Sequence, residues 1–310
     1  MKILFFGRGA IGTQYAWALE KAGHTVEFYV REGRKAQYGS HVNLEILDAR
    51  RGKKDRLVKE KWPIVIHEDI PSNHNYDLIF VSVNPEQITS SVEYLAPRIG
   101  NASVLFIGNF WRDIKQAAHP IPLNQVVWGF PGCGGGCEGN TIYGGLYKTI
   151  NFGLFESEPS ARDIEIHKLF ADAGFKVALH RDFQSWLMNH FVSNAAMEME
   201  VLKSGSFEKV SMSKEALAGV NSNTKEMIPI LKAKGVRLDT LTKAMGVLPP
   251  RAVGSLMKNL VFSPNSMPFA LMKHNHYKVG AAVQEIISEA RKYNIQAPRL
   301  FEAERLITQK

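Results

Sequence analysis

A short segment near the N-terminus has glycines at the spacing used by dinucleotide-binding proteins. Gly7, Gly9 and Gly12 stand at its first, third and sixth positions. The first glycine permits a tight turn, the second lets a pyrophosphate approach the backbone, and the third lets a helix pack closely on a strand. The N–H groups at the start of that helix then attract the anion. The residues predicted to bind the cofactor here are Gly7, Arg8, Gly9, Ala10, Ile11 and Gly12.

The residues after the second predicted strand indicate which dinucleotide is bound. An NAD site places Asp or Glu there, to accept a hydrogen bond from the ribose 2′-hydroxyl. This chain has Arg31 at the strand end, with Arg34 and Lys35 close by. Guanidinium groups bind a phosphate through paired hydrogen bonds, so these residues favour NADP(H). Glu32 leaves the NAD alternative open, since a shift of one position would place its carboxylate at the ribose.

The elements around the glycine segment make the motif specific. An apolar run over 2–6 predicts a buried strand, the spacing over 11–22 predicts a helix, and 25–30 predicts a second strand. These three form a βαβ unit, which opens a doubly wound sheet. Further strands are predicted at 42–47, 62–66, 78–83, 103–107, 126–129, 148–155 and 175–179, and helices at 86–95 and 160–174. No strand is predicted in the glycine-rich segment 132–145.

The character of the chain changes near residue 180. Long helical patterns follow, over 183–203, 214–234, 239–245, 249–259 and 281–293. The sequence therefore predicts two domains. Residues 1–180 form an α/β Rossmann domain with a doubly wound, mostly parallel sheet, and residues 181–310 form an all-α domain for substrate and dimer contacts.

Composition narrows the possible partners. The 310 residues are 45% hydrophobic and 22% charged, which excludes a disordered chain. The net charge of +8 is spread along the chain without interleaved aromatic residues, so we expect no nucleic-acid partner. Cys133 and Cys137 have no further ligands at zinc spacing, so no metal site is predicted. No apolar run reaches the length of a membrane span, and we expect a cytoplasmic protein without membrane contact.

With these motifs in this order, the chain resembles the ketopantoate reductase (2-dehydropantoate 2-reductase) family over essentially its whole length. The glycine segment and Arg31 match the family's cofactor-binding positions. Gln87 and Asn109 match further cofactor positions, and Asn194 and Ser266 match substrate-binding positions of the helical domain. The resemblance implies hydride transfer from NADPH to a small 2-keto acid, ketopantoate or a related compound, in pantothenate biosynthesis.

The chain departs from the family at the positions that carry the chemistry. His190 stands where the family has a catalytic Lys, and Lys278 stands where it has a catalytic Glu. Asn84 replaces a Lys beside the cofactor phosphates, and Phe110 and Trp111 replace small glycines. These departures do not affect the expected binding of NADPH. They concern mainly the identity of the substrate.

The replacements still suit the reduction of a 2-keto acid, which needs a proton donor for the developing alkoxide and a cation for the carboxylate. His190 can donate a proton if its surroundings keep it protonated near neutral pH. It lies one turn before Asn194 on the same helix face. We expect Lys278 to lie on a helix near position 278 and either to act as the acid or to bind the substrate carboxylate. The alternative that His190 is a satisfied interior residue stays open.

Two classes of function follow. The first is an NADPH-dependent oxidoreductase that acts on a small keto acid, with His190 and Lys278 as catalytic residues. The second is a non-catalytic NADP(H)-binding sensor or regulator on the same fold. Polar candidates in the helical domain favour the enzyme, and the methionine-rich helical domain suggests a homodimer.

Overall fold

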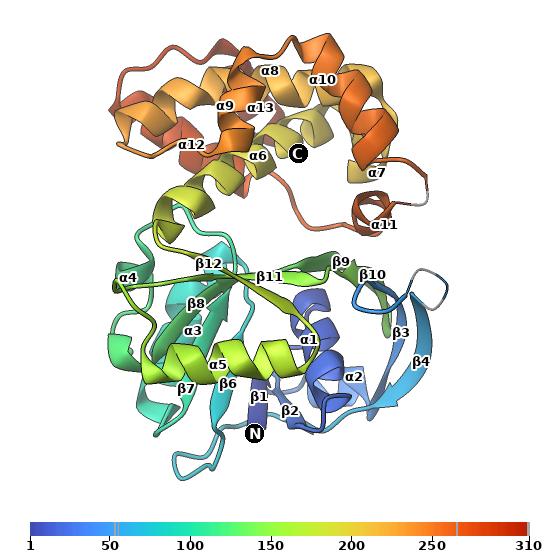
Figure 1. Cartoon of the computed structure of the whole chain (residues 1–310), viewed down its shortest axis with the longest axis vertical. Coiled ribbons are helices and arrows are strands. Elements are labelled where there is room, and N and C mark those ends of the chain that lie inside the picture. The colour runs from blue at the N-terminus through green and yellow to red at the C-terminus, as the bar shows by residue number, and fades with distance from the viewer. Residues whose placement is uncertain (53, 55, 265, 309–310) are drawn as a thin grey trace. The chain divides into compact units, whose positions relative to one another are not determined.

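The computed structural model describes residues 1–52, 54, 56–264 and 266–308. The chain divides into two compact units, Met1–Phe183 and Gln184–Lys310 (Figure 1). The predicted boundary after residue 180 falls between the last strand of the first unit and the long helix that follows it.

The first unit contains an eight-stranded sheet in the order β12-β11-β8-β7-β6-β1-β2-β5. Every pair of neighbouring strands is parallel except the pair formed by β8 and β11, which is antiparallel. The predicted doubly wound, mostly parallel sheet is therefore confirmed. Its central strands are buried throughout, as expected of a sheet covered on both faces. The strands are β1 Lys2–Phe6, β2 Thr25–Tyr29, β5 Ile66–His67, β6 Leu78–Val81, β7 Ser103–Ile107, β8 Val126–Phe130, β11 Thr149–Gly153 and β12 Lys176–His180.

A second, four-stranded sheet was not predicted. Its order is β4-β3-β10-β9, with β3 His41–Asp48, β4 Leu57–Pro63, β9 Cys133–Glu138 and β10 Thr141–Leu146. The glycine-rich segment 132–145 thus forms a hairpin, in which a Cβ on Gly135 would lie 2.0 Å from the Tyr143 carbonyl oxygen. Glycine is needed there for the close backbone approach. The predicted strand 62–66 is also corrected, because its ends belong to β4 in this sheet and β5 in the other.

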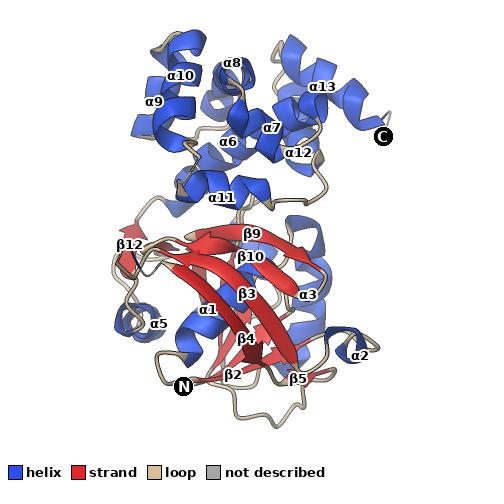
Figure 2. Ribbon diagram, turned by 90° about the vertical axis from the view of Figure 1, so that its right-hand side faces the viewer, coloured by secondary structure: helices blue, strands red, loops and turns tan. Residues whose placement is uncertain are grey.

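Helix α1 (Ala10–Glu20) lies between the two sheets, in contact with β1 and β2 on one side and with β9 and β10 on the other (Figure 2). Every residue from Gly12 to Leu19 is buried. The helix is therefore buried around its circumference, and its polar residue Gln14 donates to the carbonyl oxygens of Ala10 and Gly134. The other helices of this unit are α2 Lys35–Tyr38, α3 Ile88–Leu95, α4 Ile114–Ala117 and α5 Ala161–Asp172, joined by short 3₁₀ turns.

The second unit is helical in the part of the chain that the structure describes, as predicted. The central helix α8 packs against α9, α10, α12 and α13. The helices are α6 Phe183–Ser204, α7 Phe207–Met212, α8 Lys214–Ala233, α9 Thr240–Val247, α10 Pro250–Leu256, α11 Met267–Lys273, α12 Ala281–Lys292 and α13 Pro298–Thr308, with a π-helical turn over Met257–Val261.

Candidate functional site

The glycine turn after β1 has the backbone geometry that a pyrophosphate requires. Gly7 adopts φ +96°, and its N–H donates to the Tyr29 carbonyl oxygen at 2.8 Å. Gly9 caps α1 with an extended backbone, no side-chain cap, and open space where a Cβ would stand. A Cβ on Gly12 would lie 2.9 Å from Ser82 Oγ, so α1 packs closely on the segment after β6. The N-terminus of α1 is left to attract an anion.

This turn lies at the topological switch point of the sheet, where β1 is flanked by β2 on one side and by β6 on the other. The segment after β6 carries the predicted residues Asn84 and Gln87, both exposed. The Asn84 N–H donates to Gln87 Oε1 at 3.2 Å across the turn Pro85–Gln87. Gln87 therefore shapes this segment as well as facing solvent.

Arg8, inside the glycine turn, is only 5% exposed. Its guanidinium lies over the Tyr38 ring at 4.3 Å, and its Nη2 donates to Asn140 Oδ1 at 2.9 Å. The Nε and Nη1 atoms are buried without a hydrogen-bond partner among the described residues. Burial lowers the pKa of this arginine. A buried cation with two unpartnered nitrogen atoms beside this glycine turn suits an anionic cofactor.

The predicted NADP-reading residues follow β2. Arg31 and Glu32 are both exposed, and Arg34 Nη1 donates to Gln37 Oε1 at 2.8 Å. The Lys35 backbone N–H donates to the Glu68 carboxylate at 2.8 Å. The charge at this strand end is therefore mixed, and Arg31 is available at the surface.

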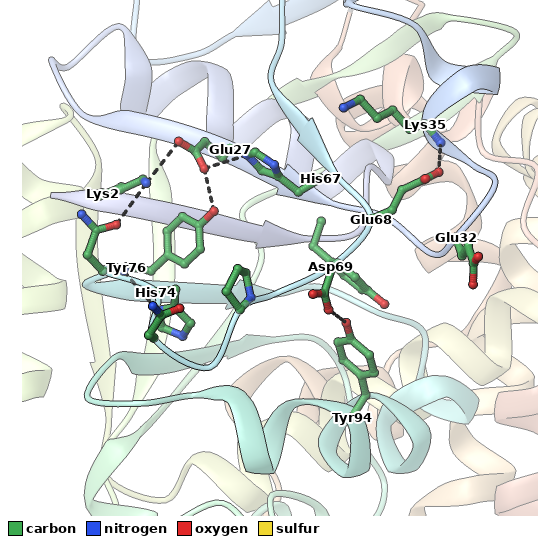
Figure 3. A pocket seen from close by; sticks show the side chains of 14 residues that line it. Lys2, Glu27, Glu32, Lys35, His67, Glu68, Asp69, His74, Tyr76 and Tyr94 are labelled. Atoms are coloured by element: carbon green, nitrogen blue, oxygen red, sulfur yellow. Dashed lines mark hydrogen bonds and ion pairs between the residues drawn. The ribbon is translucent and has the colours of Figure 1, made fainter.

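A groove of about 980 Å³ runs beside β2, with Glu32 and Lys35 near one end (Figure 3). Towards the other end Glu27 accepts hydrogen bonds from the Tyr76 hydroxyl at 2.6 Å and from His67 at 2.9 Å, and pairs with Lys2. Burial raises the pKa of Glu27, but these partners outweigh it and lower the pKa overall. The groups at this end satisfy one another.

Asn109 follows β7, as predicted. Both atoms of its amide group are buried and lack a hydrogen-bond partner in the described part of the chain. The aromatic residues beside it are taken up by the core, since Phe110 and Trp111 are each 4% exposed and Phe110 meets the Trp128 ring edge-on at 5.0 Å. An unsatisfied buried amide calls for a ligand with both a donor and an acceptor. A nicotinamide dinucleotide has such groups, so the residues present fit this cofactor.

In the second unit, α6 carries His190 and Asn194 one turn apart. The Trp186 ring stacks on the imidazole of His190, with ring centroids 5.7 Å apart. Burial lowers the pKa of His190 to about 4, although Asp239 opposes the shift. The imidazole is therefore neutral near pH 7, and the condition set for a protonated acid is not met. It can still donate one N–H.

Ser266 directly precedes α11, and Lys278 lies shortly before α12. The Ser266 hydroxyl caps α11 by accepting the Phe269 N–H at 3.2 Å. Lys278 is exposed on the irregular segment 274–280 that precedes α12, which corrects the expectation that it lies on a helix. Gly280 is the last residue of this segment and the N-cap of α12. It adopts φ +118°, a conformation that favours glycine.

Sequence reasoning missed Glu198, which joins the Lys278 segment to α6. The Tyr277 hydroxyl and the Gly280 N–H both donate to its carboxylate, at 2.9 and 2.7 Å. Glu198 is four residues beyond Asn194, so the segment lies against α6 one turn after this predicted substrate-binding residue. The spacing of positions 190, 194 and 198 was the available signal.

Among the described residues, no three His, Cys, Asp or Glu side chains are grouped so that they could hold a metal ion. No described helix is both long enough and apolar enough to cross a membrane.

Known proteins provide a comparison with this geometry. Solved structures with similar folds include a D-mandelate dehydrogenase with NADH and anilino(oxo)acetate, at TM-score 0.75 and 15% identity, covering 100% of this chain and 97% of that one. A 2-dehydropantoate 2-reductase from Geobacter metallireducens GS-15 gives TM-score 0.70 and 16% identity, covering 100% and 99%. A dimeric ketopantoate reductase from Staphylococcus aureus gives TM-score 0.68 and 13% identity, covering 100% of both chains.

At these identities the solved structures show the shared fold alone. The curated protein sequences contain no match. A family model, described as ketopantoate reductase PanE/ApbA, matches residues 3–157, which is half of the chain and includes the glycine turn, Arg31 and Asn109. The chain belongs to the ketopantoate reductase PanE/ApbA family.

Proposed function

We propose that the protein is an NADPH-dependent oxidoreductase that reduces a small 2-keto acid, ketopantoate or a related carbonyl compound. The glycine turn at the switch point of the parallel sheet is the observation that carries the proposal. Family membership supports a reductase, and the fold-related dehydrogenase solved with NADH and anilino(oxo)acetate supports a carbonyl next to a carboxylate.

The residues of the first unit would hold the cofactor. The N–H groups at the start of α1 would bind the pyrophosphate, because Gly9 leaves the approach open. The buried guanidinium of Arg8 would add positive charge beside the turn. The buried Asn109 amide would orient the nicotinamide end of the cofactor through its unused donor and acceptor. The bound cofactor supplies the hydride.

The residues of the second unit would bind and polarise the keto acid. Lys278 carries the positive charge that a substrate carboxylate requires. His190, neutral at pH 7, would donate an N–H hydrogen bond to the oxygen on which negative charge develops, and solvent water would supply the proton that completes the hydroxy acid. Asn194, on the same face of α6, adds a further amide for the substrate.

Arg31 would select NADPH by binding the 2′-phosphate. We expect Arg31→Met to raise the Kd for NADPH about tenfold while leaving the Kd for NADH unchanged, because only NADPH loses a charge-assisted contact. Fluorescence titration with each cofactor measures both constants, and Arg305→Met, at an exposed position on α13, serves as the control. Equal weakening of both cofactors, or a wild-type preference for NADH, would contradict this role.

The activity itself is tested by oxidation of NADPH in the presence of ketopantoate and of a panel of 2-keto acids that includes 2-oxo-2-phenylacetate. Turnover with at least one 2-keto acid is the expected result. NADPH binding without turnover across the panel would overturn the enzyme and favour the sensor or regulator.

We also propose that the protein is a homodimer. The fold-related ketopantoate reductase from Staphylococcus aureus is described as dimeric, and the second unit exposes large apolar side chains such as Val247 and Leu260. Light scattering on the purified full chain measures the mass, and a value of one chain over the working concentration range would contradict the dimer.

A further inference from the structure

Glu198 is a carboxylate held inside the helical unit, with only 3% of the residue exposed. It lies on α6 one turn beyond Asn194 and two turns beyond His190. Burial raises the pKa of this carboxyl, although its hydrogen bonds oppose the shift. A buried carboxylate is costly unless it is well hydrogen-bonded, so its partners indicate what it stabilises.

Its two oxygens hold the two ends of a four-residue stretch. Oε1 accepts from the Tyr277 hydroxyl and Oε2 accepts from the Gly280 N–H. Lys278 lies between these two anchors, on the segment 274–280, which forms neither a helix nor a strand. The Tyr277 ring also packs on Phe207 of α7, at 5.1 Å between ring centroids.

The same carboxylate caps α12. Gly280, the N-cap residue, has no side chain to accept from the first turn, and that turn contains no acidic residue. Three backbone N–H groups, those of Gly280, Ala282 and Val283, face the Glu198 carboxylate. A negative charge at a helix N-terminus is favourable, so Glu198 fixes the start of α12 and with it the place of residue 278, two residues before the N-cap.

A second buried carboxylate two residues away makes different contacts. Glu200, 7% exposed, accepts from Asn223 Nδ2 at 2.9 Å and from Arg299 Nη2 at 3.4 Å, and thereby joins α6 to α8 and α13. Among the described residues, its hydrogen bonds and ion pairs go to Asn223, Arg299 and Lys203, and none goes to the Lys278 segment. The two residues therefore separate a general structural role from a role that is specific to this segment.

We propose that Glu198 is a positioning residue, which holds Lys278 where it binds the carboxylate of the substrate. The proposal rests on the proposed function, in which Lys278 is the cation for a 2-keto acid. It assigns Glu198 no contact with the reacting atoms. Its effect should therefore appear in KM for the keto acid and in the order of segment 277–283, while NADPH binding is unchanged.

The first arm of the test is steady-state kinetics on the full-length enzyme. We expect Glu198→Ala to raise KM for the keto acid about tenfold with a smaller change in kcat, because a displaced cation weakens binding. Glu198→Gln should restore KM to within about threefold of wild type, since Gln can accept from Gly280 and donate to the Tyr277 oxygen. Tyr277→Phe, which keeps the ring on Phe207, should give an intermediate value and covers the case in which Glu198→Ala fails to fold.

Glu200→Ala is the matched control. It should lower the Tm at least as much as Glu198→Ala, because it removes the buried carboxylate that accepts from both Asn223 and Arg299, yet leave KM near the wild-type value. If Glu198→Ala lowers Tm and KM stays unchanged, or if Glu200→Ala raises KM equally, the positioning role is overturned.

The second arm is amide hydrogen exchange over segment 277–283, which needs no substrate. Faster exchange in Glu198→Ala, and no change there in Glu200→Ala, is the expected result. An enzyme inactive towards every 2-keto acid would overturn the proposed function, and the exchange arm would then decide alone whether Glu198 holds this segment. Unchanged exchange in Glu198→Ala overturns the inference whatever the activity.

Discussion

Backbone geometry builds the candidate site of the first unit, whereas side chains build that of the second. Gly7, Gly9 and Gly12 act through a positive φ, an open approach and a close helix contact, none of which needs a functional group. His190 and Lys278 would act through hydrogen bonding and charge; the pKa of His190 depends on burial and on Asp239, and Glu198 holds the segment that carries Lys278. Substitutions in the first unit should therefore act by filling the space that the cofactor needs. Substitutions in the second unit should act by removing a charge or a hydrogen bond from the substrate.

The largest effect should come from adding a methyl group to the glycine turn. Gly9 has an ordinary φ and open space within the protein, so Gly9→Ala should leave the Tm unchanged while raising the Kd for NADPH about 100-fold, since the methyl group meets the pyrophosphate. Gly12→Ala should affect both quantities, because its Cβ would meet Ser82 Oγ at 2.9 Å.

Fluorescence titration and thermal unfolding measure these two quantities. Ser82→Gly in the Gly12→Ala background should recover part of the lost stability by removing the colliding atom. A loss of Tm in Gly9→Ala with unchanged NADPH affinity would place the ligand elsewhere and remove the distinction between the two glycines.

The second unit should respond to loss of charge rather than of space. Lys278→Met keeps the length of the side chain and removes the cation, so we expect KM for the keto acid to rise about 30-fold. Lys273→Met, at the end of α11, is the control and should change KM little. If both Lys278→Ala and His190→Ala leave turnover unchanged, the assignment of catalytic roles to this unit is wrong.

The smallest effect concerns pH. The folded-state pKa of His190, about 4, lies below its ordinary value of 6.5, so the unfolded chain takes up the proton first. Stability due to the neutral imidazole is complete above the ordinary value and is lost as the pH falls towards 4. At pH 5.5 the expected loss is about 1 kcal/mol relative to pH 7.

Urea unfolding of wild type and His190→Asn at both pH values measures this loss, since Asn does not titrate. The free energy of unfolding of the variant should fall less between pH 7 and 5.5 than that of wild type. His276→Asn, at an exposed position, should behave as wild type. Parallel pH dependence in wild type and His190→Asn would show that the imidazole is not held neutral by burial.

The sequence was most informative where local rules and tertiary structure coincide. The order of β1, the glycine turn, α1 and β2 was predicted because each step has its own residue pattern. The strands β9 and β10 were not predicted, because they are rich in glycine and β10 pairs with the distant strand β3. Periodicity along one segment contains no information about such pairing.

The candidate residues show the same division. Gly7 and Asn109 could be placed at strand ends from the order of elements alone. The buried state of Arg8 depends on Tyr38 and Asn140, which lie far from it in sequence. The pKa of His190 and the role of Glu198 likewise depend on packing between helices, which the sequence pattern does not specify.

The enclosure of α1 between two sheets has a consequence for folding. Both sheets bury apolar side chains against this one helix, so neither can be completed while the other is open. The first unit should then unfold cooperatively, with the glycine-rich hairpin as part of the same transition. A nucleotide bound at the first turn of α1 would raise the unfolding temperature of the entire unit rather than ordering one loop. Cofactor occupancy and the folding of this unit would be linked as a single equilibrium.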